Sequence, residues 1–387
     1  MITPSFGLTA TERVLPKLAL DFTTASLDNR ITFTRAGNTA TVINSSGLVT
    51  TINADLPRFD YTLNTGGDCK GLLIEEARTN LLLQSNDVSN AAYTVSNVTV
   101  VANSSAAPDG TLTAAKATIT NTAANQFFQY NLSSFAGQTL TVSFYGKADS
   151  PMTLQSHISD SVAGEFFFPS LTTTWQRFTY TMPQAVTSPN TGFFISLNTN
   201  STTPFYIWGV QLEVGAFATS LIPTTAATVT RNADVATMTG TNFSDWFNAA
   251  QGTFAATFLT FASAGPNTII HAGTNSNFND RIALLTTPSN FVVANSAGVN
   301  QATLGSVSRL NVESTMIGAY KENDFAWAVD GNTPSTDASG VTPSPVAFCL
   351  GYRNTASPNL FLNGLLRKVS YWPQRLTNNE VQAFSKG

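Results

Sequence analysis

The stretch TLTVSFYGKADS, residues 139–150, decides the fold class of this 387-residue chain. Apolar and polar side chains alternate along it, so an extended strand places one kind on each face. The apolar face carries Leu140, Val142 and Phe144. Such alternation is typical of antiparallel sheets that pack one face on a core and leave the other face in water. This stretch therefore predicts a strand of a β-sandwich.

The same alternation recurs on both sides of a turn-rich passage. It is found in WQRFTYTM (175–182), GFFISLN (192–198) and FYIWGVQLEVG (205–215). In the last of these we expect a single face that carries Tyr206, Trp208, Val210 and Leu212. Clusters such as APDG and TSPNTG supply the Pro, Asn, Asp and Gly that turns require. The spacing predicts a compact jelly roll over residues 85–223.

A second set of alternating stretches follows a Thr/Ala-rich passage that we interpret as a linker near residues 224–234. They are residues 252–263, 281–287, 314–323, 324–332, 347–354 and 364–373. The DGN triplet at Asp330 is a tight-turn signal. Residues 224–387 are therefore predicted to form a second sandwich, in which Trp327 faces the core.

One short helix is predicted near the C-terminus. Thr377 and Glu380 have the spacing of a capping box, and Leu376 and Val381 that of a hydrophobic staple. The opening residues 1–84 contain short β segments with too little apolar density for a core of their own, so we expect them to pack on something else. The predicted fold is all-β: two tandem antiparallel sandwiches, an irregular β-rich N-terminal segment and a C-terminal helix.

Composition restricts the function. Only 11% of residues are charged and the net charge is −4, with no basic run, so the electrostatic footprint of a nucleic-acid binder is missing. No apolar stretch approaches the roughly 20 residues that span a bilayer, and the first 20 residues lack a signal-peptide layout. We expect a soluble chain made in a cytoplasm. Cys69 and Cys349 are expected to be free and not to bind metal.

Three parts of the sequence resemble known families. RITFTRAGNTATVINSSGLV, LPRFDY and GLLIEEARTNLL look like an N-terminal signature of bacteriophage structural proteins. WQRFTYTM and FYIWGVQLEVGAFATSLIPTT are similar to the jelly-roll, carbohydrate-binding-like module that follows this signature. AYKENDFAWAVDGN, AFCLGYRN and LNGLLRKVSYWPQRLTNNEVQAF resemble a concanavalin A-like, laminin G-type sandwich.

The resemblance implies a virion protein, such as a tail fibre, tail-tip component or capsid decoration protein. It implies contacts with other virion proteins and binding of host-surface glycans. It supplies no cofactor; calcium binding is left open, and the C-terminal sandwich shows no clear acidic calcium-binding loop. Because virion appendages reuse identical surfaces, we expect a homo-oligomer, with a trimer as the first expectation. Residues 1–84 are the expected attachment and oligomerisation segment, and no catalysis is expected.

Candidates for catalysis are few. His157 and His271 are the only histidines, and neither lies in a nucleophile-elbow motif or at metal-chelating spacing, so we expect polar or buried structural roles. The alternative is a tailspike-type, glycan-cleaving enzyme with paired carboxylates, for which Asp160 and Glu165 are the candidates. Glu75 and Glu76 are adjacent and point to opposite faces of a strand, so we expect one of them to pair with Arg78 or a backbone amide.

Sugar binding needs flat aromatic faces together with amides or charged groups that satisfy hydroxyls. The competing interpretation is that these rings are core or subunit interface, which is the role we expect for Trp175 and Trp208. The candidates in the jelly roll and the C-terminal sandwich are Phe127, Gln129, Tyr130, Tyr145, His157, Phe167, Tyr352, Arg353 and Asn354.

Overall fold

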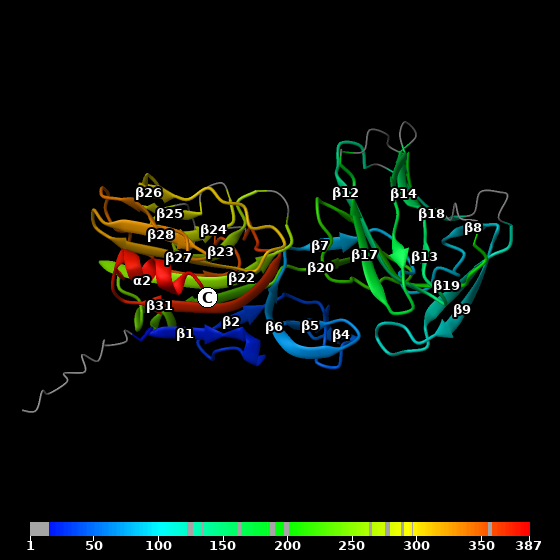
Figure 1. Ribbon diagram of the computed structural model, residues 1–387, viewed down its shortest axis with the longest axis horizontal. Helices are drawn as coiled ribbons and strands as arrows, with labels where there is room; N and C mark the ends of the chain where they lie inside the picture. Colours follow the sequence, from blue (N-terminus) through cyan, green and yellow to red (C-terminus); the bar gives the residue numbers. More distant parts are fainter. Residues whose placement is uncertain are drawn as a thin grey trace, which may run out of the picture.

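The computed structural model is almost entirely β-structure, arranged as two sandwiches that lie side by side (Figure 1). Residues 1–14 lie outside the part that the structure describes. The described residues are 15–121, 127–133, 135–160, 164–183, 185, 190–196, 201–262, 265–274, 279–287, 290–295, 297–354 and 358–387. Within them, no helix is long and apolar enough to cross a membrane. The predicted all-β class is confirmed.

The larger sandwich is built from two sheets packed over one core. Its first sheet has the order β29 (Ser335–Asp337), β28 (Phe325–Val329), β27 (Ser314–Lys321), β22 (Gln251–Thr260), β31 (Gly364–Trp372), β6 (Gly66–Ile74) and β5 (Phe59–Thr62), with β1 (Leu18–Asp21) also paired to β31. Its second sheet has the order β2 (Thr32–Thr34), β21 (Val235–Thr239), β30 (Ala347–Leu350), β23 (Thr268–Gly273), β24 (Arg281–Leu285), β25 (Phe291–Ala294) and β26 (Asn300–Leu304).

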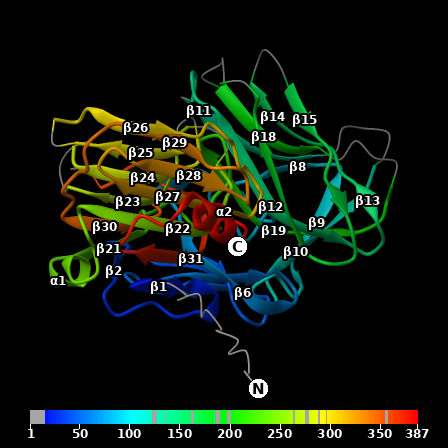
Figure 2. The ribbon, with the colours of Figure 1, turned by 60° about the vertical axis from the view of Figure 1, so that its left-hand side comes forward.

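The N-terminal strands complete this larger sandwich. Leu20 pairs with Val369, Phe33 with Ala236, and Leu73 with Leu365. The strands β1, β2, β5 and β6 therefore share sheets with residues 235–372, and the burial that these N-terminal strands need is found within the same chain (Figure 2). The role of residues 1–84 in attachment stays a prediction.

The middle sandwich is inserted between β6 and β21 of the larger one. One sheet has the order β17 (Gln176–Thr181), β12 (Leu140–Ala148), β19 (Phe205–Val214), β10 (Ala114–Ile119) and β9 (Val98–Ser105). The other has the order β15 (Gly164–Phe167), β14 (Ser156–Asp160), β18 (Asn190–Ser196), β11 (Phe127–Ser133) and β8 (Thr94–Ser96), and β13 (Met152–Thr153) pairs with β16 (Ser170–Leu171). Leu140, Val142 and Phe144 are fully buried between these sheets, as predicted.

The opposite face of β12 departs from the expected wet face. Thr141, Ser143 and Tyr145 are buried, because residues 218–221 and the hairpin of β3 (Ala40–Ile43) and β4 (Val49–Ile52) pack near this face. The expected single face of β19 is also wrong. The pairing register shifts between Ser143 and Tyr145, at the level of Gly209, whose φ is +63°. This bulge separates Trp208, on the outer face, from Val210 in the core.

Two short strands connect the sandwiches. β7 (Arg78–Asn80) leads into the middle sandwich and pairs with β20 (Val229–Arg231), which leads out of it. The helices are short: the 3₁₀ helix η1 (Phe22–Thr24), α1 (Thr241–Ser244) and α2 (Asn378–Phe384). The capping box of Thr377 and Glu380 is confirmed at the start of α2, and Trp327 is buried in the large core.

Candidate functional site

Five buried charged side chains meet where the sandwiches join. We call them the junction ion cluster: Arg35, Arg58, Glu75, Arg231 and Asp234. Each side chain is 5% exposed or less. Removing charges from water is costly unless they are paired and hydrogen-bonded, so this concentration requires mutual neutralisation. The cluster unites the N-terminal strands with the chain that returns from the middle sandwich.

The contacts within the junction ion cluster are direct. Arg58 Nη2 lies 2.8 Å from Glu75 Oε2 and also contacts Asp234. Arg35 Nη1 lies 3.0 Å from the other oxygen of Asp234, and Arg231 Nη2 lies 3.4 Å from Glu75 Oε2. Burial alone raises the pKa of Glu75, but Arg231, Arg58 and the hydrogen bonds from Ser220 hold that pKa at about 2. Glu75 is therefore ionised at neutral pH.

Glu75 and Glu76 have the separate partners that their adjacent positions predict. Ser220 donates to both oxygens of Glu75, from its backbone N and its Oγ, each at 2.7 Å. Arg78 Nε donates to Glu76 at 2.6 Å. The expectation of one pairing with Arg78 or a backbone amide is confirmed.

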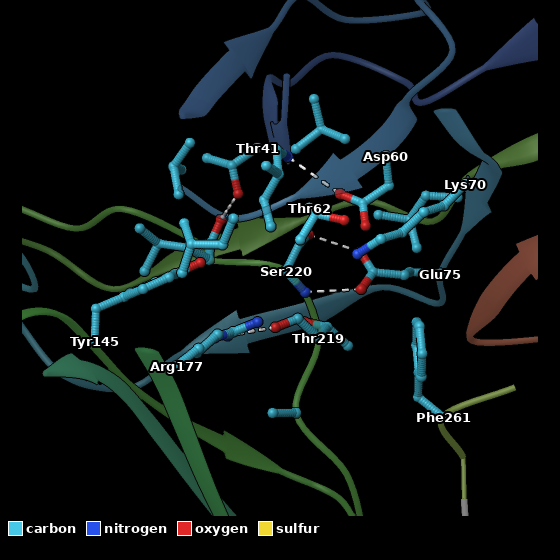
Figure 3. A pocket seen from close by; sticks show the side chains of 17 residues that line it. Thr41, Asp60, Thr62, Lys70, Glu75, Tyr145, Arg177, Thr219, Ser220 and Phe261 are labelled. Atoms are coloured by element: carbon cyan, nitrogen blue, oxygen red, sulfur yellow. Dashed lines mark hydrogen bonds between the residues drawn. The ribbon is translucent and has the colours of Figure 1, made fainter. Parts of the chain in front are cut away.

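A cavity of about 390 Å³, which we call the junction cavity, lies beside the junction ion cluster. Figure 3 shows Asp60, Lys70 and Glu75 on one side of it and Tyr145 and Arg177 on another. Its walls come from β3, β4, β5 and β6, from residues 218–221, and from β12 and β17 of the middle sandwich. The lining residues are Thr41, Val42, Ile43, Val49, Asp60, Thr62, Leu63, Lys70, Leu73, Glu75, Tyr145, Arg177, Ala218, Thr219, Ser220, Leu221 and Phe261.

Asp60 is the acidic group in this cavity that forms no ion pair within the described residues. It accepts a hydrogen bond from the Ile43 backbone N at 3.2 Å. Burial raises the pKa of Asp60, and the Ile43 bond and the charge of Lys70 oppose that rise. On the opposite side, Arg177 Nη2 donates to Thr219 O at 2.6 Å and to Ser143 Oγ at 2.9 Å. The cavity thus offers acceptors and donors between apolar walls.

Among the glycan-binding candidates whose side chains the structure describes, only Tyr145 lines this cavity. Its ring is 3% exposed and lies against Arg177 and Trp208. Tyr130 packs on Tyr93, with ring centroids 5.5 Å apart, and Phe167 stacks on Tyr180 at 4.7 Å. Gln129 donates to Asn131 at 2.5 Å. The side chains of Phe127 and His157 lie outside the described residues, as do those of Asp160 and Glu165.

The glycan-binding candidates in the C-terminal sandwich do not line the junction cavity. Tyr352 is not on an exposed rim: it is 2% exposed and stacks on Phe361, with centroids 5.8 Å apart. Arg353 is half-buried and donates from Nε to Asn359 at 2.8 Å, and Asn354 follows it. The structure does not bring these three residues to the junction cavity. Their role in glycan binding stays a prediction.

Sequence reasoning missed the groups that build the junction. Arg35 and Asp234 are 199 residues apart, and Arg58 and Asp234 are 176 apart, so no local spacing connects them. The available signal was the scarcity of charge: in a chain with 11% charged residues, Arg35, Arg58 and Glu75 all fall within the N-terminal segments 30–49, 56–61 and 71–82. Among the described residues, no group of three or more His, Cys, Asp or Glu side chains is placed to hold a metal ion. Cys69 and Cys349 are free, as expected.

No known protein family matches the sequence, and no curated protein is similar to it. Solved structures show partial likeness. A carbohydrate-binding module of a Ruminococcus gnavus sialidase, bound to sialyllactose, aligns at 15% identity and TM-score 0.33 over 36% of this chain and 83% of that one. A family 4 carbohydrate-binding module aligns at 21% identity and TM-score 0.26, over 37% and 96%. A tailspike enzymatic domain of bacteriophage CBA120 aligns at 13% identity and TM-score 0.28, over 34% and 20%. At these values no residue role is carried over to this chain.

Proposed function

We propose that this chain is a bacteriophage virion protein of the tail fibre, tail-tip or capsid decoration type, which binds neighbouring virion proteins and holds host-surface glycans without catalysis. The observation that carries the glycan-binding part is the junction cavity. Its volume of about 390 Å³ falls within the range of roughly 300 to 1,000 Å³ that is usual for ligand sites. Its apolar walls and few charged groups suit a saccharide, which presents an apolar ring face and a rim of hydroxyls.

Each polar group in the cavity has a role in this proposal. Asp60 accepts hydrogen bonds from sugar hydroxyls, while Lys70 and Arg177 donate to ring or hydroxyl oxygens. Tyr145 and Phe261 supply aromatic surface. Because Glu75 is already satisfied by Ser220 and two arginines, it fixes the wall and does not bind the ligand.

The virion role is supported by what the N-terminal signature does in the fold. Its residues Arg35, Arg58 and Glu75 lie in the junction ion cluster, so the signature supplies buried ion pairs where the chain enters and leaves the middle sandwich. In this proposal those ion pairs hold the middle sandwich on the larger one, as an appendage that presents a ligand-binding module requires. Self-association, with a trimer first, and location in the virion belong to the same proposal.

A glycan-cleaving enzyme is the second candidate, and one observation favours it. Two carboxylates line the cavity, and their pKa values move apart, since burial raises that of Asp60 while arginines hold that of Glu75 at about 2. Divergent pKa values are a mark of acid and base pairs. However, Ser220 and Arg58 engage the Glu75 oxygens, so Glu75 has no free oxygen to attack a sugar or activate water. We therefore favour binding.

The test uses the full chain on an array of bacterial surface glycans, followed by calorimetry with the best ligand. Asp60→Asn should weaken binding at least about tenfold, because hydrogen bonds to a charged group contribute roughly 1.5–3 kcal/mol. The matched control is Asp68→Asn, an exposed acid on β6, which should bind like the parent chain. Chromatography of the ligand after incubation should show no cleavage.

Three results would contradict parts of the proposal. Binding unchanged by Asp60→Asn would remove the cavity as the site, and no array signal would remove glycan binding. Cleavage products that disappear in Asp60→Asn would establish the enzyme instead. Absence of the chain from purified particles, measured by mass spectrometry, would end the virion assignment.

A further inference from the structure

A second group of side chains crosses the outer face of the middle sandwich. In the sheet register, Val101 of β9 lies opposite Lys116 of β10, Lys116 opposite Tyr206 of β19, and Tyr206 opposite Lys147 of β12. Directly opposed residues point to the same face of a sheet. Their sequence neighbours Ala115, Ile207 and Ala148 are buried in the core, so this row points outward. We call Lys116, Tyr206, Lys147 and Trp175 the lysine–aromatic row.

The aromatic rings hold one lysine in place. The Nζ of Lys147 lies 5.0 Å from the ring centroid of Trp175 and 5.1 Å from that of Tyr206. A cation between two ring faces is fixed without an opposing carboxylate. Trp175 is fixed in turn, because its indole N–H donates to Ala106 O at 2.9 Å.

The charge of the row is available to a ligand. Within the described residues, neither Lys116 nor Lys147 forms an ion pair. Both lysines and Tyr206 are half-buried, and Val101 at the end of the row is 52% exposed. The chain has only seven lysines, so two that flank one tyrosine concentrate a scarce charge.

Asp149 adds a carboxylate beside Tyr206, and this carboxylate accepts hydrogen bonds from hydroxyl groups. The Tyr206 hydroxyl hydrogen-bonds to the Asp149 carboxylate; burial, this bond and the negative charge of Asp149 raise the pKa of Tyr206. Tyr206 thus keeps its proton at neutral pH, and its ring orientation is set. The row combines two ammonium groups, the half-buried ring of Tyr206 and one carboxylate on an outer sheet face, and Trp175, only 8% exposed, is a buried support for Lys147.

We propose that the lysine–aromatic row is a subsite for a saccharide that carries an anionic substituent, a carboxylate or a sulfate. The ammonium groups of Lys116 and Lys147 bind the anion, and the half-buried ring of Tyr206 covers the apolar side of the sugar, while the buried Trp175 holds Lys147 in place. The inference deepens the proposed glycan-binding function and rests on it. The subsite is separate from the junction cavity, because none of the four residues lines that cavity.

The test measures binding of the full chain to three oligosaccharides by calorimetry: an oligogalacturonate, its carboxyl-reduced neutral counterpart and a sulfated galactose oligomer. The parent chain should bind at least one anionic oligomer about tenfold more tightly than the neutral one, and this preference should fall as salt rises. Lys116→Gln and Lys147→Gln should each abolish most of the preference. Lys321→Gln, at an exposed position on the larger sandwich, should leave it unchanged.

Lys147→Gln loses two ring contacts, so the thermal unfolding of each variant is recorded. If Lys147→Gln unfolds at a lower temperature than the parent chain, the conclusion rests on Lys116→Gln, because Lys116 makes no ring contact within the part of the chain that the structure describes. The uronate and sulfate arms identify which anion is bound. Equal binding of anionic and neutral oligomers overturns the subsite and leaves glycan binding intact. No binding of any of the three oligosaccharides also overturns the subsite, whereas the glycan-binding function itself is overturned only if the glycan array gives no signal either.

Discussion

His271 is buried without a hydrogen-bond partner among the described residues. Its side chain lies on β23, 1% exposed, and neither ring nitrogen is bonded. Burial lowers the pKa of His271 to about 3, and the charges of Arg281 and Arg353 add to that effect. The folded chain therefore keeps His271 neutral, whereas the unfolded chain protonates it below its ordinary pKa of 6.5.

This burial predicts acid sensitivity. The stability contributed by neutral His271 is complete above pH 6.5 and decreases as the pH falls from 6.5 to about 3, by about 1.4 kcal/mol per pH unit. In His271→Leu, the slope of the unfolding free energy against pH should decrease by the equivalent of about one bound proton. The free energy of unfolding at pH 4.5 should be higher than in the parent chain. Urea unfolding between pH 4.5 and 7.5 measures it, and an unchanged slope would contradict the neutral buried state.

Glu75 supports three partners at once, so Glu75→Gln should be strongly destabilising. Removing one member of a buried ion pair leaves an uncompensated charge, which costs about 3–5 kcal/mol. The neighbouring Glu76→Gln is the matched control: its side chain is 32% exposed, and its loss should cost about 1 kcal/mol or less. Denaturant unfolding at pH 7 compares the two.

Glu75 also makes the folding stability depend on pH, in a second and lower pH range. The folded pKa of Glu75 lies at about 2, below its ordinary 4.5, so its contribution is complete above pH 4.5 and decreases as the pH falls toward 2. In Glu75→Gln this part of the acid transition should be absent.

Helix α2 is the element whose formation depends most on residues that are close in sequence. Thr377 accepts from the Glu380 backbone N at 3.3 Å, and Glu380 accepts from Thr377 N at 2.7 Å. Thr377→Ala should cost about 1 kcal/mol, because the first turn loses a cap. Thr333→Ala, at an exposed loop position, should change stability little. Thermal unfolding that does not separate the two variants would show that α2 contributes nothing to global stability.

The elements show what alternation predicts and what it misses. The strands around Phe144 and Trp327 and the cap at Thr377 follow from side chains close in sequence. The face of Trp208 does not, because the bulge at Gly209 changes the register after that residue. Likewise Tyr145 could be named as a candidate, but Asp60, Lys70 and Arg177 could not be joined to it. Their meeting depends on pairing between distant strands, which alternation leaves open.

The division of the whole chain into two sandwiches can be tested with shortened chains. Residues 224–387 alone lack β1, β2, β5 and β6, which supply buried side chains such as Leu20, Phe33 and Ile74 to the large core. This fragment should not unfold cooperatively in a thermal melt. A chain that joins Gln84 directly to Thr225 should do so, because the Gln84 backbone N already bonds to Thr225 O at 2.9 Å. A cooperative melt of residues 224–387 would contradict the prediction that this fragment needs the N-terminal strands.

The paired strands β7 and β20 also decide how the protein bears load. β7 continues from β6 in the first sheet of the larger sandwich, and β20 precedes β21 in the second. A pull on a ligand held by the middle sandwich therefore reaches the larger one along two backbone connections, one into each sheet. Because Arg58, Glu75 and Asp234 tie those connections together at their base, tension is divided between two sheets that share one core.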